Sequence, residues 1–288
     1  MKVRKAVVLA AGWGTRFLPV TKAVPKELLP VVDKPVIHYV MEEIVNAGLD
    51  IIILVTAQGK EAIESYFDRA AELERTLADR GQMALLKLAQ SPTTLAKVSY
   101  VRQAEQLGIG HAVLTAEPFI GQEPFALVFP DDIIVGGLAP AIGELAQVYE
   151  ERERSVVAVE RVPREQISRY GIIDPEPVRE RVYRAKNLVE KPRPEDAPSD
   201  LGIVGRYILT PSIFDAIRKT PRGVGGEIQI TDALQRLAER EGVYACQFTG
   251  ERYDTGSPLG MLKAGISLGL ARSDIGAELR EYIRGLKG

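Results

Sequence analysis

Two glycines and two cations follow an apolar run near the start of the chain. The segment reads VVLAAGWGTRFLPVTKAVPKELLPV from Val7, with Gly12 and Gly14 one residue apart and Arg16 and Lys26 beyond them. Glycine lets a backbone approach a ligand, and successive N–H groups form a concavity that binds anions. Arginine can fork onto a phosphate, while lysine adds a mobile point charge. The spacing favours a phosphate-binding loop, and a tight turn with solvated lysines is the alternative.

Two common phosphate-binding patterns do not fit this loop. The dinucleotide fingerprint needs a third glycine three residues after the second, and Phe17 stands there. The acidic residue expected after the next strand is missing from ILVTAQG. A P-loop needs Gly-Lys-Ser or Gly-Lys-Thr, which the segment also lacks. The loop is therefore predicted to bind phosphate in another way.

Two further polar residues stand at the ends of strand-like runs. Gln103 ends KVSYVRQ, and Asp131 follows PFALVFP. An amide carries both a donor and an acceptor, which suits the edge of a base, and Mg²⁺ takes a few carboxylates together with phosphate oxygens and waters. A solvated strand end and a turn residue remain open as alternatives. Asp132 would point the other way in an extended segment, so Asp131 ranks above it.

Alternating strands and helices must position these residues. Apolar or alternating runs predict strands over residues 5–11, 50–57, 97–103, 124–132 and 155–162. Helical spacing lies between them, over residues 36–47, 60–79, 110–117 and 138–153. The pattern predicts an α/β fold with a Rossmann-like, mixed, mostly parallel sheet and helices on both faces. Ligands of such sheets lie beyond the carboxyl ends of the strands. Residues 12–16, called the glycine loop below, follow the first predicted strand at this position.

The second half of the chain is less regular. Extended pieces are predicted on both sides of residue 180, a proline-rich loop over 192–200 and a strand over 201–209. Helices are predicted over 211–219 and 230–241, a strand after residue 242, and a mostly helical segment from residue 258.

Composition limits the class of protein. The chain has 288 residues and a net charge of −2, so it lacks the basic excess of a nucleic-acid-binding protein. Cys246 is its one cysteine, which excludes an internal disulfide, fits a reducing compartment and predicts a cytoplasmic protein. No apolar run is long enough for a transmembrane helix, so no membrane partner is expected.

The segment LAAGWGTRFLPVTKAVPKELLPVVDKPVI resembles the signature of the sugar-nucleotide nucleotidyltransferases. Ala11 and Glu27 make it similar to the bacterial UTP–glucose-1-phosphate uridylyltransferases of that family. The resemblance continues from Lys2 to about Leu270 through VRQAEQLGIGHAV, FPDDIIV, RYGIID, LVEKP, IVGRYIL, GGEIQITDAL and RYDTGSPLG. It implies that glucose 1-phosphate attacks the α-phosphorus of UTP in line, giving UDP-glucose and pyrophosphate with the help of Mg²⁺ and without a covalent enzyme intermediate.

The resemblance also assigns roles to residues. It implies nucleotide binding by Leu9, Ala10, Ala11, Gly12, Gly14, Glu27, Gln103 and Gly108, with Gln103 reading the base. It implies catalytic cations at Arg16, Lys26 and Lys191, the last on the sugar phosphate. It implies sugar binding by Gly171, Glu190 and Val204, with Glu227 a weaker candidate, and metal binding by Asp131 and Asp254.

One domain over residues 1–270 is expected, with a nucleotide half over about 1–135 and a sugar-binding half over about 136–257. Residues 258–288 would form a helical segment. Two roles remain open for it: contact with another subunit, since the family commonly forms dimers or tetramers, or capping of the chain's own core. Three other functions remain open: a glucose-1-phosphate thymidylyltransferase or a transferase for another base, a non-catalytic regulatory protein that binds nucleotide sugars, and a glycosyltransferase. The last is disfavoured because PDDI lacks the second spaced aspartate of an Asp-x-Asp motif.

Overall fold

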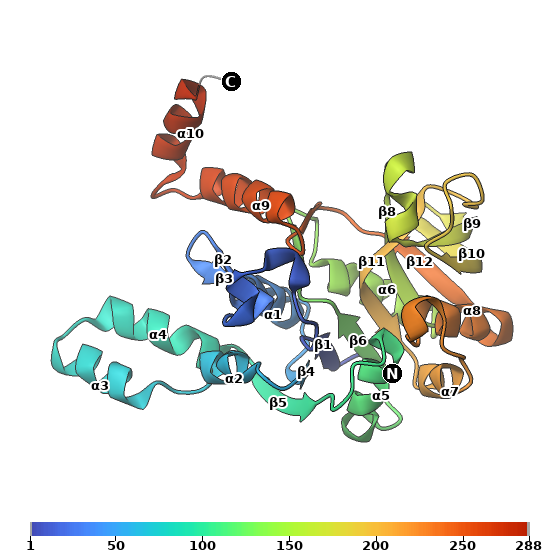
Figure 1. Ribbon diagram of the computed structural model, residues 1–288, viewed down its shortest axis with the longest axis horizontal. Helices are drawn as coiled ribbons and strands as arrows, with labels where there is room; N and C mark the ends of the chain where they lie inside the picture. The colour runs from blue at the N-terminus through green and yellow to red at the C-terminus, as the bar shows by residue number, and fades with distance from the viewer. Residues whose placement is uncertain (1, 287–288) are drawn as a thin grey trace.

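The computed structural model describes residues 2–286 and centres on a nine-stranded sheet of order β5-β4-β1-β6-β11-β8-β12-β10-β9 (Figure 1). Its first four strands run parallel: β5 (Lys97–Arg102), β4 (Ile51–Thr56), β1 (Lys5–Leu9) and β6 (Phe125–Val128). The long strand β11 (Leu201–Leu209) runs antiparallel to both of its neighbours, β6 and β8 (Val156–Arg161). The mixed sheet with a parallel part confirms the predicted fold class.

The strands from the second half of the chain form the mixed part of the main sheet. Strand β12 (Val243–Gln247) is parallel to β8, whereas β10 (Val182–Glu190) is antiparallel to β12 and to the edge strand β9 (Gly171–Arg179). Residues 201–209 are buried along their whole length, because β11 joins the two parts of the sheet in its middle. The second half therefore continues the same sheet beyond the parallel strands.

Helices cover both faces of the sheet, as predicted. One core cluster packs α5 (Ile109–Ile120), α7 (Ser212–Arg218) and α8 (Ile230–Glu241) against Val7 of β1. The other packs α1 (Val36–Asn46) and α6 (Ala141–Arg152) against Val8. Neighbouring residues of one strand point to opposite faces, so a continuous apolar run serves both cores.

Two predicted elements are divided in the structure. The helix expected over residues 60–79 is α2 (Glu61–Phe67) and α3 (Ala71–Asp79), because Asp68 takes an extended conformation. Helix α4 (Met83–Leu95) follows, and α3 and α4 form a hairpin that projects from the body (Figure 1). The strand expected over 124–132 ends with β6, and β7 (Asp132–Val135) begins after Pro130, which has no N–H for a sheet.

Small elements complete the chain. Strand β7 pairs with β13 (Glu251–Asp254) outside the main sheet, and β2 (Pro30–Val31) pairs with β3 (Lys34–Pro35). Short 3₁₀ turns lie at η1 (Thr15–Phe17), η2 (Val20–Lys22), η3 (Lys26–Leu28), η4 (Arg164–Arg169) and η5 (Val224–Gly226).

The chain closes with two helices, α9 (Pro258–Ala271) and α10 (Gly276–Gly285), which extend away from the sheet (Figure 1). This agrees with the mostly helical segment expected from residue 258. Within residues 2–286, no helix combines the length and the apolar character needed to cross a bilayer.

Candidate functional site

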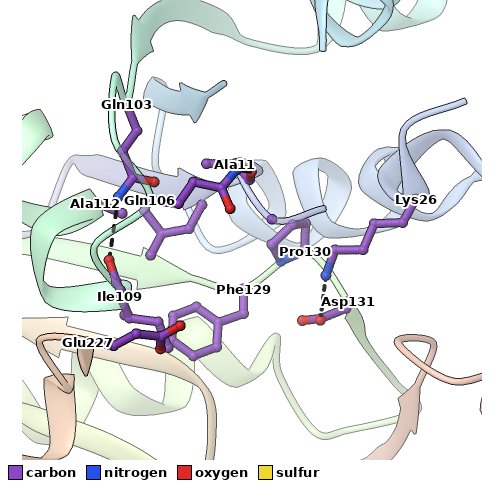
Figure 2. A pocket seen from close by; sticks show the side chains of 13 residues that line it. Ala11, Lys26, Gln103, Gln106, Ile109, Ala112, Phe129, Pro130, Asp131 and Glu227 are labelled. Atoms are coloured by element: carbon purple, nitrogen blue, oxygen red, sulfur yellow. Dashed lines mark hydrogen bonds and ion pairs between the residues drawn. The ribbon is translucent and has the colours of Figure 1, made fainter. Parts of the chain in front are cut away.

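A cavity of about 270 Å³ opens at the carboxyl ends of β1, β5 and β6 (Figure 2). Parallel strands end at the same edge of a sheet, so residues far apart in the sequence meet there. The lining residues are Leu9, Ala11, Gly12, Lys26, Gln103, Gln106, Gly108, Ile109, Ala112, Phe129, Pro130, Asp131 and Glu227. We call this the first cavity. It brings together most of the residues predicted to bind the nucleotide.

The glycine loop lies folded against Lys26. Gly14 has a φ of 68°, and a Cβ at this position would stand 3.0 Å from the Cβ of Lys26. A side chain at residue 14 would therefore meet both an unfavourable backbone conformation and a close contact. Gln106 donates from Nε2 to the carbonyl of Ala11 at 2.9 Å, which ties the loop to the segment after β5. The sequence analysis had not singled out Gln106.

Lys26 and Asp131 form an ion pair at the mouth of the first cavity. Lys26 Nζ lies 2.7 Å from Asp131 Oδ2, and Arg16 Nη2 lies 3.9 Å from the same oxygen. Burial raises the pKa of Asp131, but the attraction and hydrogen bond of Lys26 outweigh it and leave that pKa below its usual value. Burial likewise lowers the pKa of Lys26, and Asp131 and Glu27 reverse the effect. Both groups are therefore charged at neutral pH.

Glu27 does not line the first cavity. Its side chain is buried, and Oε2 accepts from Lys60 Nζ at 2.6 Å. Glu27 was predicted to bind the nucleotide, but the structure gives its carboxylate an interior ion pair with Lys60, beside Lys26. Ala10 is buried as well, and its backbone N–H is bonded to Val55. A charged residue gives no signal in the sequence that it will be buried.

Asp131 and Asp254 converge from separate elements. A Cβ on Gly256 would stand 3.2 Å from Asp131 Oδ2 and 3.0 Å from Asp254 Oδ1. The pairing of β13 with β7 places Asp254 beside Asp132, and Thr255 donates to the carbonyl of Asp131 at 2.8 Å. Residues 2–286 hold no cluster of three or more metal-ligating side chains. Asp131 lines the first cavity and Asp254 lines a neighbouring hollow, yet their carboxylates converge near Gly256. Two such carboxylates fit Mg²⁺, which completes its shell with phosphate and water.

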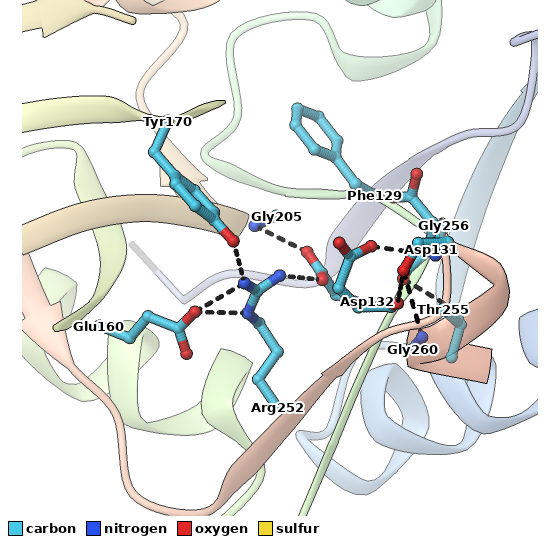
Figure 3. A network of polar contacts seen from close by, with 12 residues as sticks. Phe129, Asp131, Asp132, Glu160, Tyr170, Gly205, Arg252, Thr255, Gly256 and Gly260 are labelled. Atoms are coloured by element: carbon cyan, nitrogen blue, oxygen red, sulfur yellow. Dashed lines mark hydrogen bonds and ion pairs between the residues drawn. The ribbon is translucent and has the colours of Figure 1, made fainter. Parts of the chain in front are cut away.

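Asp132 turns into the protein interior. Figure 3 shows its carboxylate paired with Arg252 and receiving the backbone N–H of Gly205 at 3.3 Å. Arg252 also donates to Glu160 at 2.8 Å and to the hydroxyl of Tyr170 at 2.8 Å. Asp132 was predicted to be a weaker metal-ligand candidate than Asp131, and in the structure it belongs to an ionic network in the wall of the second cavity.

A second cavity, of about 180 Å³, adjoins the first and shares Ile109 and Phe129 with it. Its lining includes four residues predicted for the sugar side: Gly171, Glu190, Lys191 and Val204. Lys191 Nζ lies 3.1 Å from Glu190 Oε1 at the end of β10.

Glycine is required at residue 171 because a Cβ there would stand 2.8 Å from Thr231 Oγ1. The wall of the second cavity also includes Tyr170, from the predicted sugar-side segment RYGIID, and Thr231 and Arg252, for which no site role was predicted.

Comparisons with known proteins agree with this arrangement. The family model described as nucleotidyl transferase matches residues 5–268. The chain is 48% identical over 285 residues to a UTP–glucose-1-phosphate uridylyltransferase of Staphylococcus epidermidis, covering 99% of each chain. It is 48% identical over 282 residues to the Bacillus subtilis uridylyltransferase YngB, covering 98% of this chain and 95% of the relative.

Two similar solved structures are nucleotide complexes. A UDP-glucose pyrophosphorylase complexed with UDP-glucose has 43% identity and a TM-score of 0.84, over 94% of this chain and all of that one. A UTP-bound enzyme of the same kind from Acinetobacter baumannii has 39% identity and a TM-score of 0.90, over 99% of this chain and all of that one.

Proposed function

The chain belongs to the nucleotidyl transferase family, and from this premise we propose that it makes UDP-glucose and pyrophosphate from UTP and glucose 1-phosphate. The observation that carries the proposal is the pair of adjoining cavities. One is lined by the glycine loop, Gln103 and Lys26, and the other by Glu190 and Lys191. The relatives bound to UTP and to UDP-glucose support the same assignment.

The first cavity is suited to hold the nucleotide. Its glycine loop offers backbone N–H groups to phosphate oxygens, while Lys26 and Arg16 supply positive charge near the α- and β-phosphates. In phosphoryl-type transfer the protein mainly positions the reactants and stabilises charge on the equatorial oxygens. Gln103 stands at the far wall, where it would meet the base.

The second cavity is suited to glucose 1-phosphate. Glu190 would accept hydrogen bonds from two sugar hydroxyls, Gly171 would offer its N–H, and Val204 would pack against the ring. Lys191 would hold the sugar phosphate so that one of its oxygens faces the α-phosphorus across the shared wall. Holding two anions in this geometry removes most of the entropic barrier to their reaction.

Asp131 and Asp254 would hold one Mg²⁺ together with phosphate oxygens. The bound ion supplies charge neutralisation at the triphosphate. We regard this as the family's typical cofactor requirement, supported here by the convergence of the two carboxylates near Gly256.

The thiol and imidazole side chains are protonated or bonded to other groups, which is consistent with direct attack by the sugar phosphate. Burial raises the pKa of the Cys246 thiol to about 11, so it is protonated at neutral pH. The chain has two histidines. His38 Nδ1 pairs with Tyr66, and His111 Nδ1 pairs with Gln103. Neither contacts a serine or cysteine in these hydrogen bonds.

One assay tests the proposed function. The protein is incubated with Mg²⁺, glucose 1-phosphate and each of UTP, dTTP, CTP and GTP, and pyrophosphate release is measured. We expect UTP to react fastest, with dTTP next because thymine differs from uracil by one methyl group. Release at equal rates with all four nucleotides would overturn the proposed specificity. No release with any of them would favour a nucleotide-sugar-binding regulatory protein.

We also propose that the protein is a dimer or tetramer. Helices α9 and α10 expose the apolar side chains Leu259, Leu262, Ile266 and Tyr282. Light scattering after gel filtration should give a multiple of the chain mass of 31.6 kDa. A mass equal to one chain would contradict this proposal without affecting the catalytic one.

A further inference from the structure

Gln103 lies at the wall of the first cavity where the base of the nucleotide is proposed to bind. The orientation of its side-chain amide matters for recognition of that base. Gln103 is 5% exposed, and its backbone N–H is bonded to Thr56 at 2.8 Å, so the residue is held at the end of β5. An amide presents a donor on one side and an acceptor on the other. Which side faces the cavity decides which base edge can pair with it.

Two acceptors hold the nitrogen of this amide. Nε2 lies 3.0 Å from His111 Nδ1 and 3.4 Å from the carbonyl oxygen of Gly108. A carbonyl oxygen can only accept, which places the NH₂ group on that side. His111 Nδ1 must then accept the second N–H, so the neutral ring carries its proton on Nε2. Figure 2 shows the amide oxygen turned towards Gln106 and Ala11, on the cavity side.

We propose that His111 is a specificity-determining positioning residue that keeps the Gln103 Oε1 directed at the base. This inference rests on the proposed function. Oε1 can accept from the N3–H of uracil, whereas cytosine has a bare acceptor nitrogen at N3. The fixed amide therefore favours UTP over CTP, although His111 does not line the cavity itself.

Reversing the amide would be unfavourable in this setting. The oxygen would then face the carbonyl of Gly108, the NH₂ group would lose both acceptors, and His111 would have to move its proton to Nδ1 to donate to the oxygen. Buried polar groups without partners cost free energy. Removing the acceptor at residue 111 takes away the shorter of the two contacts, so the amide can turn and offer its N–H to cytosine.

The test compares base selectivity among variants of α5. His111→Leu removes the acceptor at similar volume, and His111→Asn restores an acceptor near the position of Nδ1. The matched control is Thr115→Ala, because Thr115 Oγ1 donates to the carbonyl of His111 at 3.0 Å, one turn along the helix. For each protein, kcat/KM is measured with UTP and with CTP, and the binding of both nucleotides is measured without sugar phosphate.

We expect His111→Leu to lower the ratio of UTP to CTP in kcat/KM by about tenfold, which is the size of one lost hydrogen bond. Most of the decrease in kcat/KM for UTP should come from a higher KM. His111→Asn should keep the ratio within about threefold of the wild type, and Thr115→Ala should leave it unchanged.

An unchanged ratio in His111→Leu, even with slower turnover, would overturn the proposal. If that variant does not fold, His111→Ala carries the same expectation, because alanine is tolerated in a helix. Loss of UTP selectivity in Thr115→Ala would mean that general damage to α5 causes the effect. If the wild type releases no pyrophosphate, the proposed function fails, and the ratio of binding constants still tests the role of His111.

Discussion

Asp131 and Asp132 are neighbours in the chain, yet they lie in two different regions of the molecule. The Asp131 side chain is 26% exposed at the mouth of the first cavity, where it faces Lys26 and Arg16. The Asp132 side chain is 9% exposed and lies against Arg252 and Gly205 in the wall of the second cavity. The bend after β6 directs one carboxylate to the mouth of the first cavity and the other into an ionic network in the wall of the second.

The difference shows how two adjacent aspartates can serve different purposes, one in binding and the other in holding the fold. Charges at an open mouth can exchange their partners for phosphate or a metal ion, which suits catalysis. Charges that are sealed in a network cannot exchange, and breaking such a network leaves an uncompensated buried charge. We therefore expect mutations at the mouth to change mainly activity. Mutations in the network should change mainly stability, with a further effect on activity at residues such as Arg252 that also line the second cavity.

The largest expected effect is on stability, from Arg252→Met. This change leaves Asp132 and Glu160 without their cation and should lower the free energy of unfolding by about 3–5 kcal/mol. Urea denaturation measures the loss. The matched control is Arg161→Met, which breaks the exposed pair with Asp200 and should cost less than about 1 kcal/mol. Equal losses in the two variants would remove the distinction between the regions.

Lys26→Met should have the next largest effect, on activity. Loss of a preorganised cation beside the reacting phosphate should reduce kcat by about 10²–10³-fold. The thermal midpoint should change little compared with the loss in Arg252→Met. Lys186→Met, at an exposed pair with Asp174, serves as the control and should keep full activity. Near-normal turnover in Lys26→Met would contradict a catalytic role for the mouth.

Asp254→Asn should change the metal requirement. If Asp131 and Asp254 share one Mg²⁺, the concentration needed for half-maximal rate should rise by about tenfold or more. A Mg²⁺ titration of pyrophosphate release measures the shift, with Asp200→Asn as a surface control. An unchanged titration curve would exclude Asp254 from the metal site.

The smallest expected effect concerns pH. Because the pKa of Asp131 is lowered in the folded protein, its pair with Lys26 stabilises the fold fully above the unfolded value of about 3.9. That contribution is lost as the pH falls through the lowered folded pKa. The stability difference between the wild type and Asp131→Asn should therefore be constant from pH 7 to about 5 and shrink on further acidification. A difference that grows in acid would contradict the assigned direction.

Local periodicity was sufficient to predict the main sheet and its helices. Helix α8 begins and ends at the predicted residues, Ile230 and Glu241, because its apolar spacing is regular and Gly242 follows. The division of the predicted strand over 124–132 depends on Pro130 and on pairing of β7 with the distant β13. Pairing between strands so far apart in the chain leaves no pattern in the local sequence from which it could be predicted.

The candidate site was predictable in part. The glycine loop and its cations could be argued from residue chemistry, whereas the convergence of Asp131 and Asp254 was expected only from the family resemblance. The interior position of Glu27 and the contact of His111 with Gln103 had no signal in the sequence. Both depend on packing between segments that are separate in the chain, Glu27 with Lys60 and α5 with the end of β5.

The central claim is that the two cavities hold one nucleotide sugar, with a single metal ion between Asp131 and Asp254. A crystal structure with UDP-glucose and Mn²⁺ in place of Mg²⁺, with the ion located by anomalous scattering, tests it most directly. We predict uracil beside Gly12 and Gln103, glucose beside Gly171 and Glu190, and one anomalous peak between the two aspartates. Uridine bound away from the glycine loop, or a peak at Asp132 instead, would contradict the account.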